Sequence, residues 1–284
     1  MPIPFSPGGP DQSDLLPPHL GREAQAAARE GVIQALGKGE PRSRGAALML
    51  QGKPGAAAQQ ALALEHRDLL LAHWGLQSCA PADRLCRQRM ISRAIEVDGD
   101  NLASRLELLT LEPQRRDEWR RAFALAKRFD FYWGALAAEV ARVEPPRTWA
   151  YLRSGLVVEA FGLEAAIAVP GLQSLVSLCK PPPAPGNEVQ AQCSAIARTM
   201  VERSDTLLVY SIGIRLGEAA GWPTEELSRL RKDKASMEQS STADANSDQP
   251  WSCASVAAML SRAEAIGSKG EMGFLRERMA ASPR

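Results

Sequence analysis

Four residues of the kinds that bind zinc fall between positions 66 and 86: His66, His73, Cys79 and Cys86. Zinc sites usually take ligand pairs about two to five positions apart, because such pairs reach one ion together. The spacings here are seven, six and seven residues. We therefore expect no metal site, and we interpret the two histidines as residues on helix surfaces.

Close pairs of carboxylates are the next candidates, since general acid and base catalysis often uses two such groups that converge on a substrate. Glu159 and Glu164 are five residues apart on one predicted helix and point in different directions, while Asp98 and Asp100 lie in a predicted exposed turn. The chain has no Gly-x-Ser-x-Gly elbow, no phosphate-binding loop and no Cys-His pairing. We expect a protein that is not an enzyme and needs no cofactor.

A helical hydrolase or a secreted effector that acts on the cell envelope is the alternative function. It requires two carboxylates from different helices that meet in a deep pocket. The combinations that the sequence offers are Glu139 or Glu159 with Glu164 or Glu202.

Basic and aromatic residues between positions 115 and 133 are the candidates for binding a protein partner. Arginines and aromatic rings dominate the binding energy of many protein interfaces. A charged helix face is also commonly just solvated, and an aromatic cluster also closes the core between neighbouring helices. The residues that we expect at a partner interface are Arg116, Trp119, Arg120, Phe131, Tyr132 and Trp133.

The cysteines form two predicted pairs. Cys79 and Cys86 would be too far apart for a disulfide within one unbroken helix, but Pro81 makes a corner at which the chain can fold back. Cys179 and Cys193 flank a proline-rich loop, where a bridge would join two helix ends. Two such bridges favour an exported protein, periplasmic or secreted. Inert thiols in a cytoplasmic protein are the alternative.

The N-terminal sequence does not support export. The first twenty residues are rich in proline and glycine and lack the basic and apolar regions of a signal peptide. Export therefore requires a natural start that lies upstream. The fifth cysteine, Cys253, is interpreted as an unpaired thiol.

The composition indicates a globular, helical and bacterial protein. Of the 284 residues 45% are hydrophobic, and alanine, leucine, arginine, glutamate and glutamine, which all favour helices, are abundant. The 27 arginines against 7 lysines are typical of a GC-rich bacterial genome. A net charge of +1 argues against nucleic acid as the main partner, and no stretch of about 20 apolar residues predicts a membrane span.

Helical periodicity and Gly or Pro stop signals delimit the elements that must position these residues. We expect helices at 22–36, 42–50 and 56–77, a helical hairpin over 83–111 and a second hairpin from 114–128 and 131–143. Pro170 splits the next apolar run into a buried hairpin of 148–168 and 172–179. A third hairpin joins 188–203 to 205–220, followed by helices at 225–232, 251–266 and 271–279.

The first two hairpins share a period of 32 residues, which places Asp130 where Asp98 stood. The junction RAIEVDGDN at 93–101 resembles the end of one tetratricopeptide repeat and the start of the next, where an alanine-containing helix runs into an acidic turn. The resemblance covers residues 85–109. It implies a solenoid of stacked antiparallel hairpins, in which the first helices form a concave surface that binds a protein partner.

Four regions follow from this interpretation. They are a disordered leader at 1–20, a hairpin-repeat domain at 21–234, a flexible linker at 235–249 and C-terminal helices at 250–284 that cap the array. The linker is predicted from its Ser, Thr, Asp, Asn and Gln content. The sequence thus favours a non-enzymatic module for protein binding or scaffolding.

Overall fold

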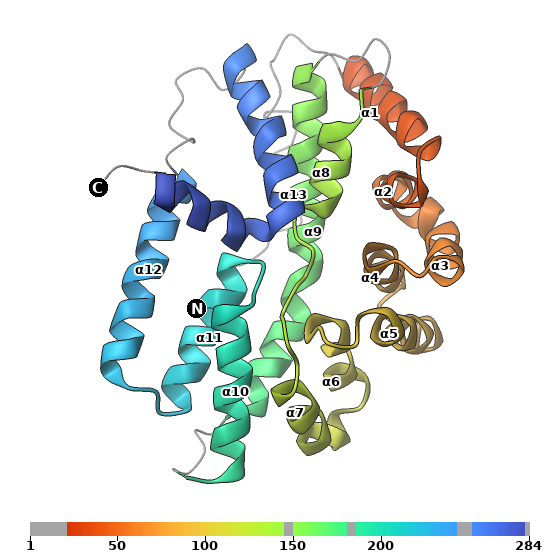
Figure 1. The fold of residues 1–284 in the computed structure, drawn as a ribbon. Coiled ribbons are helices and arrows are strands. Elements are labelled where there is room, and N and C mark those ends of the chain that lie inside the picture. The colour runs from red at the N-terminus through yellow and green to blue at the C-terminus, as the bar shows by residue number, and fades with distance from the viewer. Residues whose placement is uncertain (1–21, 145–149, 181–185, 243–251, 282–284) are drawn as a thin grey trace.

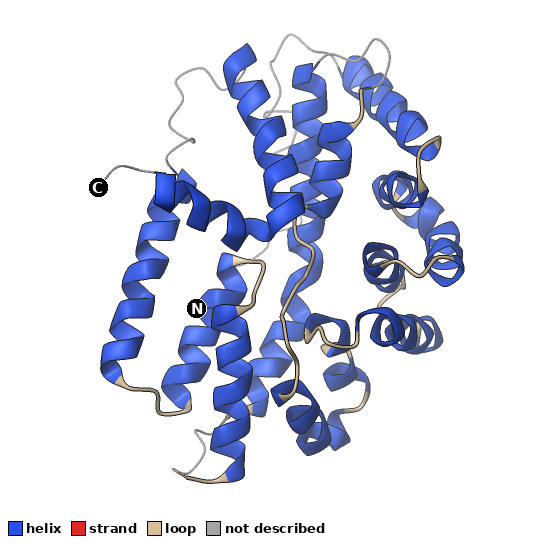
Figure 2. Ribbon diagram, viewed as in Figure 1, coloured by secondary structure: helices blue, strands red, loops and turns tan. Residues whose placement is uncertain are grey.

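The computed structural model describes residues 22–144, 150–180, 186–242 and 252–281, and all regular structure in these ranges is helical (Figure 2). No strand forms there, although two isolated backbone bridges join Asn101 to Arg128 and Phe129 to Ser204. The all-α prediction is confirmed. The predicted leader at 1–20 lies outside the described residues.

Five helices follow one another along one side of the molecule (Figure 1). They are α1 (Arg22–Gly37), α2 (Pro41–Gln51), α3 (Ala56–Glu65), α4 (Leu69–Gln77) and α5 (Arg84–Asp98). Each helix packs on the next in the chain. This part of the fold is a succession of short helices that pack in chain order.

The single helix predicted at 56–77 is in fact two helices, α3 and α4. Asp68 accepts hydrogen bonds on Oδ1 from the backbone N–H groups of Leu70 (2.9 Å) and Leu71 (3.1 Å). An aspartate that binds the first free N–H groups of a helix is a strong start signal. His66, just before it, has the extended backbone that ends α3.

The predicted first hairpin forms only in its first half. Helix α5 is present, but the second helix is reduced to a 3-10 turn, Ala103–Arg105, and one helical turn, α6 (Leu108–Leu111). Asn101 accounts for this, because its side-chain oxygen accepts a hydrogen bond from the Ala103 N–H at 3.1 Å. A side chain that binds its own downstream backbone competes with helix formation.

The second predicted hairpin is wrong. Helices α7 (Arg116–Ala124) and α8 (Ala135–Arg142) are separated by residues 125–134, which run without regular structure through the middle of the molecule (Figure 1). We call residues 125–134 the central segment. Helix α7 packs mainly on α10, whereas α8 packs mainly on α13 and α9, so α7 and α8 do not pair with each other as a hairpin.

The hairpin predicted around Pro170 is one continuous helix, α9 (Ala150–Leu178). A proline inside a helix removes one backbone hydrogen bond, so packing must compensate. Leu156, Val157 and Ala160 are buried on one side of position 170, and Leu172 and Leu175 are buried on the other. Burial of both halves keeps the helix in one line.

The last four helices are α10 (Glu188–Glu202), α11 (Leu207–Ala219), α12 (Thr224–Thr242) and α13 (Cys253–Ala281). The α10–α11 hairpin is confirmed. Helix α12 continues through positions 235–242, so the linker prediction is wrong there, while 243–249 lie outside the described residues. Helix α13 bends at Gly270, whose φ is +72°.

Two hydrophobic cores hold the described residues together. One lies among α1–α5, α8 and the first halves of α9 and α13. The other lies among α6, α7, α10–α12 and the second halves of α9 and α13. Helix α13 thus belongs to both cores, which corrects the prediction that it caps one end of an array. The central segment passes between the two cores, where Phe129 joins one and Tyr132 the other.

Candidate functional site

The central segment has an uncommon backbone conformation. Tyr132 has φ +56°, a region that residues with a side chain seldom adopt, and Gly134 has φ +88°. The Asp205 carboxylate holds the turn, because its Oδ2 accepts hydrogen bonds from the N–H groups of Phe131 (3.0 Å) and Trp133 (3.1 Å). Such strained positions persist where the surroundings enforce them, and they are frequent at functional sites.

A buried polar network fixes the start of the segment. Asp98 is 5% exposed and accepts hydrogen bonds from Asn101 Nδ2 (2.7 Å), Ser104 Oγ (3.0 Å) and the Tyr132 hydroxyl (2.7 Å). The Arg128 guanidinium forms an ion pair with the same carboxylate. The prediction of an exposed turn is therefore wrong for Asp98, a buried side chain whose oxygens accept hydrogen bonds from several donors.

Asp130 belongs to the same network. Its N–H donates to Asn101 Oδ1 (2.9 Å), and its carbonyl accepts from Asn101 Nδ2 (2.7 Å). Burial, together with the nearby charge of Asp130, raises the pKa of Asp205 well above its usual range. Asp130 and Asp205 thus both help to hold the turn of the central segment.

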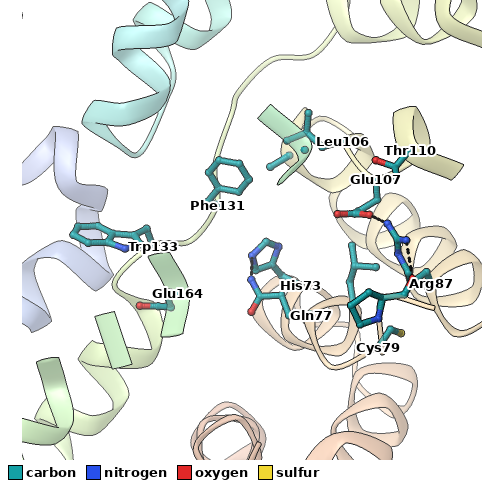
Figure 3. Close-up of a pocket in the computed structure, with 14 residues that line it drawn as sticks. His73, Gln77, Cys79, Arg87, Leu106, Glu107, Thr110, Phe131, Trp133 and Glu164 are labelled. Carbon is teal, nitrogen blue, oxygen red and sulfur yellow. Dashed lines mark hydrogen bonds and ion pairs between the residues drawn. The ribbon is translucent and has the colours of Figure 1, made fainter. Parts of the chain in front are cut away.

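A cavity of about 410 Å³ opens between α4, the α5–α6 region and the central segment. Figure 3 shows Trp133 and Glu164 on one side of it and His73 and Gln77 on the other. Phe131 adds a second aromatic ring. Much of the remaining lining is apolar or uncharged and comes from Leu76, Cys79, Pro81, Ala103, Leu106 and Gly171.

His73 is neutral at pH 7, because burial lowers its pKa to about 4, against the opposing charges of Asp130 and Asp98. Its Nε2 lies 2.6 Å from Gln77 Nε2, and its ring meets the Tyr132 ring edge-on at 5.6 Å. The interpretation of His73 as a helix-surface residue is wrong. Gln77 Oε1 is buried and has no hydrogen-bond partner among the described residues.

The charged groups at the cavity have partners of their own. Arg87 and Glu107 form an ion pair. Glu164 accepts hydrogen bonds from the N–H groups of Gly134 (2.9 Å) and Leu136 (2.8 Å), at the start of α8. Burial raises the pKa of Glu164 to about 8, although these N–H groups favour its charged form. The cavity therefore holds little uncompensated charge at neutral pH.

The predicted partner residues fall into two groups. Phe131 and Trp133 line the cavity. The Tyr132 ring contacts the ring of His73, which lines the cavity as well. The other three, on α7, face neighbouring helices. Arg116 donates a hydrogen bond to the Ser177 carbonyl, and Arg120 donates one to Gln192 Oε1. Trp119 packs on the hydrophobic core around α10.

The cysteine pairs lie at disulfide distance. Cys79 and Cys86 have a Cα–Cα distance of 5.7 Å, and Cys179 and Cys193 one of 5.9 Å. Cys79 also lines the cavity, so the first bridge ties the cavity wall to the first turn of α5. Cys253 is free and exposed.

The carboxylates that the hydrolase alternative requires lie in separate contacts. Glu139 accepts a hydrogen bond from Ser43 (2.8 Å), Glu159 pairs with Arg29 (3.3 Å), and Glu202 pairs with Arg198 (3.8 Å). Glu164 caps α8, as described above. Asp100, in the exposed turn, pairs with Lys127 (2.8 Å).

Three residues of the candidate site are not among those predicted from the sequence: Gln77, Asn101 and Asp205. Gln77 is four residues after His73, a spacing that places both side chains on one helix face. Asn101 and Asp205 bind backbone groups about 30 and 70 positions away. Nothing in the sequence next to Asn101 or Asp205 indicates contacts over such distances along the chain.

No protein-family model, no curated protein and no solved structure matches this chain. Among the described helices, none has both the length and the apolar character needed to cross a lipid bilayer.

Proposed function

We propose that this chain is a non-catalytic binding protein that takes a segment of a protein partner into the cavity beside the central segment. The observation that carries the proposal is the cavity itself. Aromatic rings and aliphatic side chains line it, and its few polar groups are fixed by a supporting hydrogen-bond network. Pockets of this size and character are the usual place for a bound group.

Binding accounts for the polar groups better than catalysis does. A general base must accept a proton near the working pH. His73, with a pKa of about 4, is a poor base at pH 7. Glu164 has a pKa of about 8, but it is buried and its two oxygens are held by the N–H groups of Gly134 and Leu136. These groups orient and shape the cavity rather than transfer protons.

We infer that a protein partner reaches the cavity from the outer surface. Thr110 and Pro81 are exposed, and both line the cavity. Leu85, 80% exposed, lies beside Cys86 on α5 and offers an apolar contact near this entrance. The stacked helices α1–α5 would serve as the tetratricopeptide-like scaffold, and the two cysteine pairs support an oxidising compartment such as the periplasm.

A photo-crosslinking experiment tests the proposal. The crosslinking amino acid p-benzoylphenylalanine is placed at Thr110, at the cavity rim, and at the exposed Ser228 on α12 as a control. We expect a discrete adduct with a host protein from Thr110 and none from Ser228. Equal adducts from both positions, or none from Thr110, would overturn the proposal.

A pocket-filling variant makes the test specific. Ala103→Trp places an indole in the cavity, whereas the matched change Ala58→Trp lies on an exposed position of α3. Only Ala103→Trp should abolish the adduct from Thr110. Circular dichroism verifies that both variants fold, and loss of the adduct in neither variant would place the partner outside the cavity.

A further inference from the structure

Two aspartates, Asp130 and Asp205, bind consecutive N–H groups in one turn of the central segment, and we call them the aspartate pair. Asp205 Oδ2 accepts hydrogen bonds from the N–H groups of Phe131 (3.0 Å) and Trp133 (3.1 Å). Asp130 Oδ1 accepts one from the N–H group between them, that of Tyr132 (2.7 Å). Consecutive Cα atoms are about 3.8 Å apart, so the carboxyl groups that bind these neighbouring N–H groups lie close together.

The backbone also encloses Asp205 next to Asp130. The Asp205 N–H donates to the carbonyl of Phe129 (3.2 Å), the residue directly before Asp130. Its carbonyl accepts from the N–H of Met272 on α13 (3.0 Å). At the bend of α13, a Cβ on Gly270 would lie 3.0 Å from the Asp205 Cβ. Asp205 is therefore buried between the central segment and α13, and it is 8% exposed.

Among the described residues, no arginine or lysine forms an ion pair with Asp205. The arginine of the central segment, Arg128, pairs with Asp98 and with Asp130 (3.1 Å). A negative charge on Asp205 would thus be buried beside a second carboxylate without a cation of its own, which is costly. The charged groups on the other elements around it have other contacts or are exposed: Lys269 pairs with Glu277 (2.6 Å), Glu271 binds the Leu207 N–H (2.8 Å), and Arg203 is exposed.

The second oxygen of Asp205, Oδ1, is buried and receives no hydrogen bond from an N–H or O–H group of any described residue. The side chain of Asp130 is the hydrogen-bond partner beside it. Two carboxyl groups can form a hydrogen bond only when one of them carries a proton. Protonation also removes the buried charge, and burial, together with the charge of Asp130, raises the pKa of Asp205 accordingly.

We propose that Asp205 and Asp130 share one proton, and that this proton holds the central segment in the conformation that places Phe131 and Trp133 in the cavity wall. Asp205 donates through Oδ1 to Asp130 and accepts through Oδ2 from the two N–H groups. Loss of the proton leaves two carboxylates side by side, so the turn is held less firmly as pH rises. The proton-sharing pair stands by itself, whereas its effect on partner binding rests on the proposed function.

The pH dependence of urea unfolding measures the proton on Asp205. At neutral pH the folded state holds a proton that the unfolded chain has released, so this proton alone raises the unfolding constant about tenfold per pH unit. Between pH 6.5 and 7.5, the unfolding constant of Asp205→Asn should rise about tenfold less than that of the native protein, because the amide donates to Asp130 at every pH. Asp117→Asn, at a side chain that is 74% exposed, is the matched control. Equal pH dependence of Asp205→Asn and the native protein would overturn the proposal.

Infrared spectroscopy tests the sharing in the folded protein. A protonated carboxyl group has a carbonyl stretching band that is separate from the bands of a carboxylate. We expect this band at pH 7 in the difference spectrum between the native protein and Asp205→Asn. The band should shift in Asp130→Asn, because the acceptor of the proton is changed. A difference spectrum without the band, or a band that Asp130→Asn leaves in place, would contradict a shared proton.

Crosslinking from Thr110 separates the aspartate pair from the proposed function. Asp205→Asn keeps the acceptor for the N–H groups and the donor to Asp130, so it should retain the adduct. Asp205→Ala lacks both and should lose most of the adduct while circular dichroism shows that it is folded. Equal adducts from the two variants would overturn the link between the pair and the cavity wall. Absence of the adduct even with the native Asp205 would overturn the binding function and leave the proton measurements standing.

Discussion

The hydroxyl of Tyr132 donates a hydrogen bond to Asp98 across 2.7 Å, although 34 residues separate them in the chain. Through this bond a residue with strained backbone is tied to the buried end of α5. Burial and the carboxylate together raise the pKa of Tyr132, so the hydroxyl stays protonated and remains a donor across the physiological range. The central segment is thus held from the side of the first five helices as well as by Asp205.

Tyr132→Phe removes this donor and keeps the ring that contacts His73. We expect the free energy of unfolding in urea to fall by about 1–2 kcal/mol, because a buried carboxylate loses one of its hydrogen bonds. Tyr210→Phe is the control, since the Tyr210 hydroxyl makes only a 3.4 Å contact with the Leu230 carbonyl. An equal decrease in the free energy of unfolding of the two variants would show that the hydrogen bond to Asp98 contributes no more to stability than the Tyr210 contact does.

Replacement by alanine should destabilise the protein at Gly134 and stabilise it at Gly162. At Gly134, with φ +88°, a Cβ would lie 2.5 Å from Ile266 Cγ2. At Gly162, in α9, a Cβ meets nothing within 4 Å. We expect Gly134→Ala to lower the free energy of unfolding by about 2–4 kcal/mol, and Gly162→Ala to raise it by about 0.5–1 kcal/mol. Thermal unfolding of both variants measures this, and a stable Gly134→Ala protein would contradict the observed turn.

Local signals in the sequence predict much of the fold. The α10–α11 hairpin is an example, because Asn187 and Thr206 each cap a helix through a side-chain hydrogen bond and glycine and proline follow α11. The start of α5 is another, since Asp83 accepts a hydrogen bond from the Cys86 N–H. Where start and stop signals are local, residue type and spacing are sufficient.

The central segment lies beyond such prediction. Residues 129–133 are compatible with a helix by pattern alone, but Asp205 binds their N–H groups from more than 70 positions away. Pro170 shows the reverse case, where a local stop signal is overridden because both halves of α9 are buried. Phe131 and Trp133 were predicted as partner residues from their type, whereas the cavity that they line depends on these distant contacts.

Glu164 should make stability depend on pH between about 4.5 and 8. Its pKa is raised to about 8 in the folded protein from about 4.5 in the unfolded chain. Between these values the folded state holds a proton that the unfolded state has released, so stability falls as pH rises towards 8. In Glu164→Gln, the free energy of unfolding should decline less between pH 6.5 and 8, which urea unfolding at several pH values measures. At pH 6 the variant should also be about 1–3 kcal/mol less stable than the native protein, because the cap of α8 is weakened. An unchanged slope would exclude Glu164 as its source.

His73 should act in the opposite direction at lower pH. Its pKa is about 4 in the folded protein and about 6.5 in the unfolded chain. Between these values the unfolded state binds the extra proton, so stability rises with pH from about 4 to 6.5. NMR titration of the imidazole resonances should show His73 neutral down to about pH 4. A His73 that titrates near pH 6.5 would mean that it is solvated and that the cavity is polar.

The disulfides give a prediction that also reports on the cellular compartment. Alkylation without reductant should modify Cys253 alone, and peptide mapping should recover the pairs Cys79–Cys86 and Cys179–Cys193. Replacing both cysteines of a pair by alanine should cost about 2.5 kcal/mol for the shorter loop and about 3 kcal/mol for the longer one, because the unfolded chain regains freedom. Five freely alkylated cysteines would contradict both pairs and remove the support for an oxidising compartment.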